Sequence, residues 1–376
     1  MTLSPAIRGR LRFTPEGLAW LVAAIVLGLL AWSKSLNLLL VLAYVMLVLL
    51  ALNAVLARAH ALRVRATPVP LPPVFAGETV RPIIIVENVA RSSATVLVAD
   101  ARTQWSVEEL RPQDRAECGE SRRFLQRGRT AGTPIVVASG FPFGFIRYEW
   151  RTAAAADLIV LPAVGQVDAD GLRRYVLRQA GTEGRSRKVL RRATADLADV
   201  RGVRPYRPGD SIRAIHWRSS ARRRALMVRE YDAAPSPDLV LVVEPWLPDD
   251  ASPQDRANLE AALSLAAAIL QAWSSTLEIR TYLIVAGQGT PTGICPPGEV
   301  GLREAMIPLA DAIGAASFAT PEPSRFGRSL GRAARIVVSS RPNSPFAAAL
   351  SRATGKAFIA LDPSQRFPWH QPPKLG

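Results

Sequence analysis

The sequence contains few of the residues that build metal centres and disulfide frameworks. Only two cysteines, Cys118 and Cys295, occur among 376 residues, and they lie too far apart to suggest a pair of metal ligands. The three histidines, His60, His216 and His370, are scattered, so they offer little material for a zinc site. We therefore expect a disulfide-free soluble portion of the kind found in the cytosol.

Acidic residues are scarce relative to basic ones. The chain has 47 Lys and Arg against 31 Asp and Glu, which gives a formal net charge of +16. Such an excess favours acidic partners: nucleic acid, anionic lipid or an acidic face of another protein. Residues 171–232 hold seventeen of the basic residues and only six acids, so this segment supplies most of the excess.

Two long uncharged runs lie near the N-terminus. Residues 18–32 (LAWLVAAIVLGLLAW) form the first, and residues 36–57 form a second that is broken only by Asn37 and Asn53. Each is roughly long enough to cross a hydrocarbon core of about 30 Å, the first only marginally, so the two runs predict a transmembrane helical hairpin. A cleaved signal peptide is disfavoured, because the second run follows at once and no small-residue cleavage site separates the two.

Basic residues flank this hairpin on both sides. The short connector between the runs holds a single lysine, whereas each outer flank holds three arginines. The positive-inside rule therefore predicts two transmembrane helices with both termini and the soluble domains in the cytoplasm, and membrane lipid as a partner. The flanking arginines are Arg8, Arg10, Arg12, Arg58, Arg63 and Arg65.

The rest of the chain divides by pattern. After the membrane segment, β-branched runs bounded by Gly, Pro and Ser recur without a competing helical period, which predicts a β-sandwich-like domain. From residue 238 the run DLVLVVEP predicts a strand buried on both faces, and strands then alternate with helices expected over residues 255–274, 300–313 and 344–352. This alternation predicts an α/β domain with a mostly parallel sheet. The expected domains are 1–65 (hairpin), 66–165 (β-sandwich-like), 166–237 (basic connecting region) and 238–376 (α/β).

Residues 204–232, RPYRPGDSIRAIHWRSSARRRALMVREYD, concentrate unusual residues in the connecting region. Pro208 and Gly209 predict a turn, and Asp210 is placed to cap a short helix over residues 211–217. A basic loop is expected next, and residues 225–231 alternate well enough to predict a strand. We therefore expect the segment to join the β domain to the α/β domain.

This segment resembles the signature of the bacterial family called domain of unknown function 58. Upstream, Pro142, Phe143 and Gly144 are similar to the Pro-Phe-Gly turn of that family, and the resemblance covers nearly the whole chain. We interpret the matching signature residues as the interaction site of the protein. They are Arg204, Tyr206, Pro208, Gly209, Asp210, Arg213, Trp217, Arg218, Ser220, Arg222, Arg229, Glu230 and Tyr231.

The resemblance implies a von Willebrand factor A-like domain after the signature. Such domains often bind Mg²⁺ through Asp-x-Ser-x-Ser at the end of the first strand. Here Glu244, Trp246 and Pro248 stand at those positions, and the Trp and Pro side chains supply no oxygen ligand. We therefore expect this metal site to be degenerate, and no cofactor is expected.

The resemblance also implies partners, because family members are typically encoded beside MoxR-type AAA+ ATPases and transglutaminase-like membrane proteins. The leading interpretation is a non-enzymatic adaptor or scaffold at the bacterial inner membrane, working with such an ATPase in a chaperone-like or cell-envelope assembly. One alternative is an enzyme of unknown chemistry that uses Asp210 and His216, although their spacing does not place them side by side. Another is a membrane-anchored protein that binds polyanions; no motif predicts specific nucleic-acid recognition.

Overall fold

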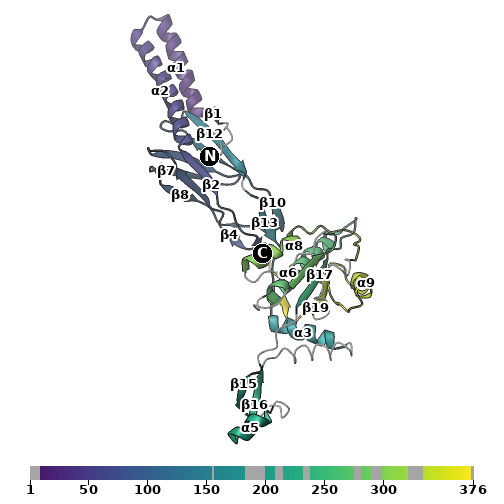
Figure 1. The fold of residues 1–376 in the computed structure, drawn as a ribbon. Coiled ribbons are helices and arrows are strands. Elements are labelled where there is room, and N and C mark those ends of the chain that lie inside the picture. The colour runs from purple at the N-terminus through teal and green to yellow at the C-terminus, as the bar shows by residue number, and fades with distance from the viewer. Residues whose placement is uncertain are drawn as a thin grey trace. The chain divides into compact units, whose positions relative to one another are not determined.

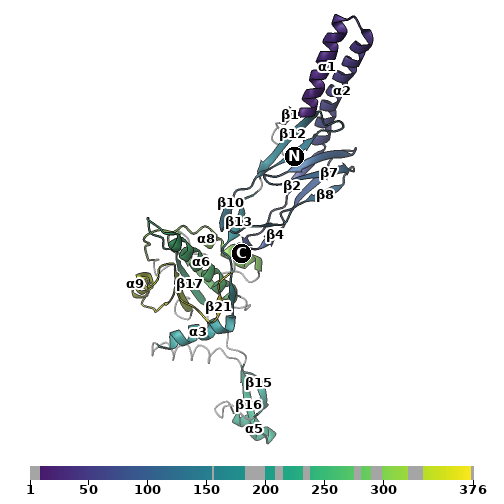
Figure 2. The same ribbon diagram turned by 180° about the vertical axis from the view of Figure 1, so that it is seen from behind.

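The computed structural model describes residues 9–154, 156–182, 200–207, 215–231, 238–274, 281–288, 299–320 and 333–373. The chain forms two compact units (Figures 1 and 2). The N-terminal unit comprises Met1–Val74, Glu78–Phe124 and Arg129–Leu158, and the C-terminal unit comprises Phe75–Gly77, Leu125–Gly128 and Ile159–Gly376. Two short segments from the first third of the chain therefore belong to the C-terminal unit.

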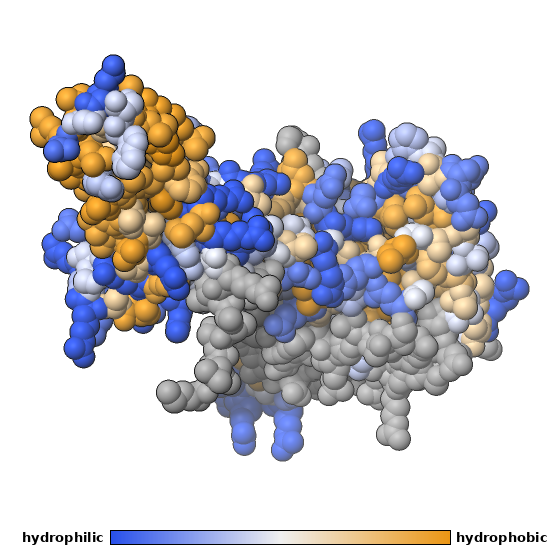
Figure 3. Space-filling model, turned by 90° about the horizontal axis from the view of Figure 1, so that it is seen from above, coloured by the Kyte–Doolittle hydropathy of each residue, from blue (hydrophilic) through white to orange (hydrophobic). Residues whose placement is uncertain are grey.

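Two apolar helices form the predicted hairpin, α1 (Pro15–Ser33) and α2 (Asn37–Leu62). Both are long and apolar enough to cross a membrane. Helix α1 begins at Pro15 because the Thr14 hydroxyl accepts a hydrogen bond from the Gly17 N–H, which caps the helix. The hairpin presents mainly hydrophobic side chains on its surface (Figure 3). Both helices extend beyond the uncharged runs of the sequence.

Antiparallel strands make up the rest of the N-terminal unit. They pair in the orders β1-β12-β11-β6-β7, β2-β5-β8 and β4-β9. A single strand would be the simplest reading of residues 79–88, but the structure divides them into β4 and β5, because Pro82 has no N–H to donate to a neighbouring strand. The bounds are β1 (Arg10–Phe13), β2 (Val64–Pro68), β4 (Thr79–Val80), β5 (Ile84–Asn88), β6 (Ala94–Ala99), β7 (Gln104–Leu110), β8 (Arg115–Cys118), β9 (Arg122–Arg123), β11 (Pro134–Ser139) and β12 (Ile146–Ala154).

The two larger sheets of this unit share one hydrophobic core. Val86 of one sheet and Val98 of the other are both fully buried in it, as the alternation of apolar residues along β5 and β6 requires. The last turns of α2 belong to the same core through Ala57 and Ala61. The Trp150 indole of β12 donates a hydrogen bond to the Ala61 carbonyl oxygen at 2.9 Å. The second helix is therefore part of the folded unit rather than a tether.

The C-terminal unit contains a parallel sheet in the order β18-β17-β19-β20. Its central strand is the apolar run that predicts a strand buried on both faces, and all six of its residues are buried. The bounds are β17 (Leu239–Glu244), β18 (Thr281–Val285), β19 (Ala334–Ser339) and β20 (Ile359–Leu361). The sequence predicts a strand over residues 277–285, and its first four residues lie outside the described residues.

Helices cover both faces of this sheet. Helix α6 (Pro253–Ser274) shares one core with alternate residues of β17, and α9 (Pro345–Thr354) shares a second core with the others. The helix predicted over residues 300–313 is broken into α7 (Glu299–Ala305) and α8 (Ile307–Ala310), because Pro308 cannot continue the hydrogen bonding of the first segment.

The remaining elements are α3 (Ala169–Thr182), the pair β14 (Gln166–Val167) and β21 (His370–Gln371), and the sheet of β3 (Val74–Phe75), β10 (Gly128–Thr130) and β13 (Leu158–Leu161).

The signature segment forms a small element of its own, made of β15 (Val200–Pro205), α5 (Trp217–Arg223) and β16 (Met227–Tyr231). The two strands pair antiparallel. A helix begins at Trp217, where the predicted helix was expected to end, and it occupies the place of the expected basic loop; residues 211–214 of the predicted helix lie outside the described residues. The reason is local: Ile215 is committed to a β-bridge with Val228, so helical geometry starts only after His216.

Candidate functional site

Helix α5 is held at both ends by features of the signature itself. The His216 Nδ1 accepts a hydrogen bond from the Ser219 N–H at 3.1 Å and so caps the helix. Arg224 adopts a left-handed conformation (φ 51°) and ends the helix after two turns. The chain then returns into β16, where the Met227 carbonyl oxygen accepts a hydrogen bond from the His216 N–H at 2.8 Å.

Ser220 fastens the helix to the strand that follows it. Its side chain is buried, and its Oγ accepts a hydrogen bond from the Met227 N–H at 2.9 Å. The same hydroxyl lies 3.1 Å from the His216 carbonyl oxygen, to which it donates. Among the predicted site residues, Ser220 therefore has a structural role: it holds α5 against the antiparallel pair of β15 and β16.

The outer surface of α5 is apolar and basic at once. Trp217 is 65% exposed, and Leu226 beyond the helix is also exposed. Exposed arginines surround them on the helix and at its end: Arg218, Arg222, Arg223 and Arg224. Trp and Arg are the residues most enriched where proteins bind one another tightly. We call this surface of Trp217, Leu226 and the four arginines the α5 surface.

The other predicted signature residues are only partly placed. Tyr206 follows β15, and its N–H donates to the Leu226 carbonyl oxygen at 2.8 Å. Arg204 lies in β15, and its Nη1 donates to the Pro205 carbonyl oxygen at 3.2 Å. Arg229, Glu230 and Tyr231 form part of the backbone of β16, whereas Pro208, Gly209, Asp210 and Arg213 lie outside the described residues.

His216 has a structural task that sequence reasoning missed. Its Nδ1 lone pair serves the helix cap, and so only the other ring nitrogen is left for proton transfer. The expected partner in the enzymatic alternative, Asp210, lies outside the described residues. The cap gives the position of the histidine an explanation that needs no catalysis.

The carboxyl end of the parallel sheet holds a second polar cluster. The Glu244 side chain is buried at the end of β17, and its Oε2 accepts hydrogen bonds from Ser339 Oγ at 2.6 Å and Ser344 Oγ at 2.5 Å. Ser344 also caps α9 by accepting from the Phe346 N–H. The cluster thus ties the ends of β17 and β19 to the start of α9.

Trp246 and Pro248, expected to stand at ligand positions of a degenerate Mg²⁺ site, follow β17. The Trp246 indole donates to the Ala316 carbonyl oxygen at 3.0 Å, and the Arg341 guanidinium lies 5.2 Å from the centre of its ring. Within the described ranges, no group of three or more His, Cys, Asp or Glu side chains is placed to hold a metal ion. The sequence reading missed the two serines that bind Glu244, because they lie about a hundred residues away from it.

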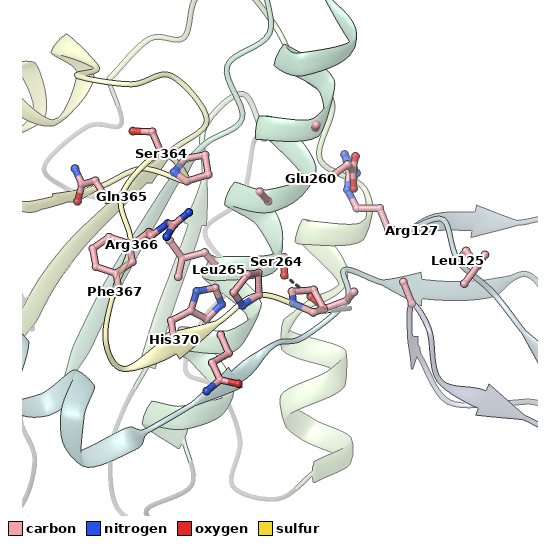
Figure 4. Close-up of a pocket in the computed structure, with 18 of the residues that line it drawn as sticks. Leu125, Arg127, Glu260, Ser264, Leu265, Ser364, Gln365, Arg366, Phe367 and His370 are labelled. Atoms are coloured by element: carbon pink, nitrogen blue, oxygen red, sulfur yellow. Dashed lines mark hydrogen bonds and ion pairs between the residues drawn. The ribbon is translucent and has the colours of Figure 1, made fainter. Parts of the chain in front are cut away.

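A pocket of about 1060 Å³ lies in the C-terminal unit, between α6 and the segment that leads to β21 (Figure 4). At one end, Arg127 Nη1 lies 3.3 Å from Glu260 Oε1, and its Nη2 donates to the Ala312 carbonyl oxygen. At the other end lie Arg366 and His370. Burial lowers the pKa of His370, so the imidazole is neutral at physiological pH.

Small side chains on α6 leave this space open. Ala257 and Ala261 line it, and the Ser264 hydroxyl donates to the Ala163 carbonyl oxygen at 2.6 Å instead of facing a base. Burial raises the pKa of Glu260, and the nearby Arg127 guanidinium partly offsets this rise. The pocket can hold an apolar group of small-molecule size. No sequence pattern could have predicted it, because its residues come from five separate stretches of chain.

Comparison with known proteins gives one finding. Residues 202–321 match the model of a family described as "Protein of unknown function DUF58". The matched span runs from β15 through the α5 surface and β17 to the residues after α8. No curated protein matches the chain. The resemblance that the signature residues carry is thereby confirmed.

Proposed function

This chain belongs to the DUF58 family, and we propose that it is a non-enzymatic, membrane-anchored adaptor that binds an acidic protein partner through the α5 surface. The observation that carries this proposal is an exposed tryptophan among four exposed arginines on a rigidly held helix. A large aromatic side chain left in water is characteristic of a surface that a partner covers.

Two apolar helices support the anchoring. Both are long enough to span a bilayer, and their exposed side chains are mainly Leu, Val, Ile and Trp. The strand before α1 pairs with β12, so the two ends of the hairpin lie on one side of any membrane that the helices span. The arginine-rich flanks assign that side to the cytoplasm of the bacterial inner membrane.

Charge supports an acidic partner. Arginine presents a planar fork of donors that binds carboxylates in pairs, and it stacks on aromatic rings. The four arginines of the α5 surface therefore suit a protein face rich in Asp and Glu. The family resemblance suggests which protein: a MoxR-type AAA+ ATPase, with a transglutaminase-like membrane protein as a further member of a chaperone-like or cell-envelope assembly.

The C-terminal unit fits the von Willebrand factor A-like role in this proposal. Its parallel sheet has helices on both faces, which is the layer order of such domains. The position for the metal-binding aspartate holds Glu244, whose carboxylate is already bound by two serine hydroxyls. Recognition in this protein is accordingly assigned to the α5 surface, with no Mg²⁺ bridging the partners.

The test measures binding of a purified MoxR-type ATPase from the same organism to the full chain in lipid nanodiscs. Trp217→Ala is expected to weaken binding at least about thirtyfold, because truncating a central interface tryptophan typically costs about 2 kcal/mol or more. Ile313→Ala is the matched control, since Ile313 is an 83% exposed apolar residue in the same unit. The partner assignment fails when the unmodified chain does not bind the ATPase, and the surface assignment fails when Trp217→Ala binds as the control does.

A further inference from the structure

The loop between β11 and β12, residues 140–145, exposes aromatic side chains at the base of the helical hairpin. Phe141 is 39% exposed and Phe143 is 47% exposed, with the exposed Pro142 between them. Leu11 and Phe13 on the neighbouring strand β1 are exposed as well. We call residues 140–145 the phenylalanine loop. Its exposed rings need an explanation, because water is a poor environment for a group of large apolar side chains.

The phenylalanine loop is fixed level with the first turn of α1. The Thr14 hydroxyl donates to the Gly144 carbonyl oxygen at 2.8 Å, and the Thr14 N–H donates to the Phe145 carbonyl oxygen at 3.1 Å. A Cβ atom added at Gly17 would lie 1.8 Å from that same oxygen, so the two backbones touch. The loop is therefore attached to α1 at the point where the helix begins.

Helix α2 holds the loop from the other side. The Asn53 side chain is fully buried, and its Nδ2 donates to the carbonyl oxygens of Gly140 and Phe141, both at 2.9 Å. Its Oδ1 accepts from the Ile146 N–H at 2.7 Å. One amide thus satisfies three backbone groups at both ends of the loop, which leaves the loop little freedom to move away from the hairpin.

One aromatic side chain of the loop already reaches along the hairpin. The Phe145 ring stacks on the Trp20 indole, with ring centres 4.6 Å apart, and the Phe143 ring lies 5.6 Å from the Phe145 ring. Trp20 is five residues into α1, which places its Cα about 7 to 8 Å beyond the start of the helix. The loop therefore lies alongside the first turns of the apolar helix.

Helix length places a membrane surface at this same level. The 19 residues of α1 extend about 28 Å, so a hydrocarbon core of about 30 Å takes up nearly the whole helix, and the first turn, which carries Glu16, lies at the level of the headgroups. On α2, which begins at Asn37, Asn53 is the seventeenth residue, and the turns beyond it enter the protein core. Arg10, Arg12 and Arg58 are exposed around the base of the hairpin, where headgroup phosphates would meet them.

We propose that Pro142, Phe143 and the exposed edge of Phe141, whose ring stacks on His60 of α2, insert into the boundary between headgroups and acyl chains of the membrane that α1 and α2 span. The N-terminal unit then rests on the lipid surface through the phenylalanine loop, in addition to its attachment to the helices. This inference depends on the membrane anchoring in the proposed function. Lipid is the occupant that the position favours, because the loop adjoins the only long apolar helices that the described part of the chain contains.

The test places spin labels on the full chain in vesicles of phosphatidylethanolamine and phosphatidylglycerol. The background carries Cys118→Ala and Cys295→Ser, and the labelled variants are Phe143→Cys, Leu29→Cys and Arg102→Cys. Leu29 is 66% exposed and lies within the apolar run of α1, about 21 Å from the start of the helix. Arg102 follows β6 at the end of that strand farthest from the loop, about 15 Å beyond the contact of Ser139 with Thr95. Collision of each label with oxygen and with a water-soluble nickel chelate reports its depth.

The label at Phe143→Cys is expected to collide with the nickel chelate about threefold less than the label at Arg102→Cys, and to collide readily with oxygen. A second label at Phe141→Cys repeats the measurement in case the first variant does not fold. Nickel access at both loop positions equal to that at Arg102→Cys overturns the inference while the anchoring stands, provided that Leu29→Cys is shielded. Nickel access at Leu29→Cys overturns the anchoring itself. Shielding of the loop from both reagents also overturns the inference, because it means that protein and not lipid covers the loop.

Discussion

Replacing Asn53 by leucine is expected to destabilise the N-terminal unit by about 3 kcal/mol. The side chain is fully buried and serves the Gly140, Phe141 and Ile146 backbone groups. Leucine has nearly the same volume, so the change removes hydrogen bonds without opening a cavity. The Ile146 N–H and the Phe141 carbonyl oxygen then lose their partner, and the Gly140 carbonyl oxygen keeps only the Gly144 N–H.

The expected loss of stability follows from how deeply each of the three backbone groups is buried. The Ile146 N–H is buried and has nowhere else to donate, which costs about 1–3 kcal/mol when its acceptor is lost. The carbonyl oxygens of Gly140 and Phe141 are only partly buried, so water can replace part of each bond, and about 0.5–1 kcal/mol apiece is expected. For a unit of this size, about 3 kcal/mol corresponds to a fall in Tm of roughly 6–12 °C.

The change in Tm is measured by thermal unfolding in detergent micelles, followed by near-ultraviolet circular dichroism. Hydrogen exchange of the Ile146 amide is a local readout, since its protection should fall in the Asn53→Leu variant more than that of the strands. Asn37→Leu is the matched control, because Asn37 is an exposed asparagine at the start of the same helix. A loss below about 1 kcal/mol with unchanged exchange at Ile146 would refute the reasoning, because the buried N–H would then have found another acceptor.

Two further predictions concern a partly buried carboxylate in the N-terminal unit and a buried carboxylate in the C-terminal unit. Burial alone would raise the pKa of Asp100, but backbone N–H groups and the Arg122 guanidinium at 2.6 Å outweigh it, so the pKa lies below its ordinary value. The resulting stabilisation is present above about pH 4 and is lost as pH falls through the lower folded-state pKa; Asp100→Asn should therefore lower Tm at pH 7 and have little effect near pH 2. In the C-terminal unit, Glu244→Leu should cost about 3 kcal/mol by leaving two serine hydroxyls without their acceptor, whereas Glu244→Gln, which keeps an acceptor, should cost less than about 1 kcal/mol in the same melting experiment. Equal losses for the two Glu244 variants would show that charge rather than hydrogen bonding holds the cluster.

Much of the architecture could be predicted from the sequence, because it depends on patterns of apolar residues that extend over many positions. The uncharged runs predict the hairpin, and the six consecutive buried residues of β17 follow from one apolar run. Alternation of strands and helices predicts the parallel sheet with helices on both faces. Because each pattern extends over many residues, a single residue that departs from it does not change the predicted helix or strand.

Side-chain roles were harder to predict, because they depend on partners far along the chain. Asn53 looks like a mere interruption of an apolar run until the loop that it holds is known. His216 looks like a catalytic candidate until it is seen to cap a helix that begins at Trp217. Glu244 was expected at a degenerate metal position, but its two serine partners lie about a hundred residues further on.

The pairing of β1 with β12 has a consequence for the order in which the protein is made. Thr14, directly after β1, contacts Gly144, and 130 residues separate the two in the chain. During synthesis, β1 and both apolar helices therefore leave the ribosome long before β12, the strand with which β1 pairs. Until then β1 is an open edge, ready to pair with another chain. Its short length and its alternating arginines, Arg10 and Arg12, are the features that protect such an edge during synthesis.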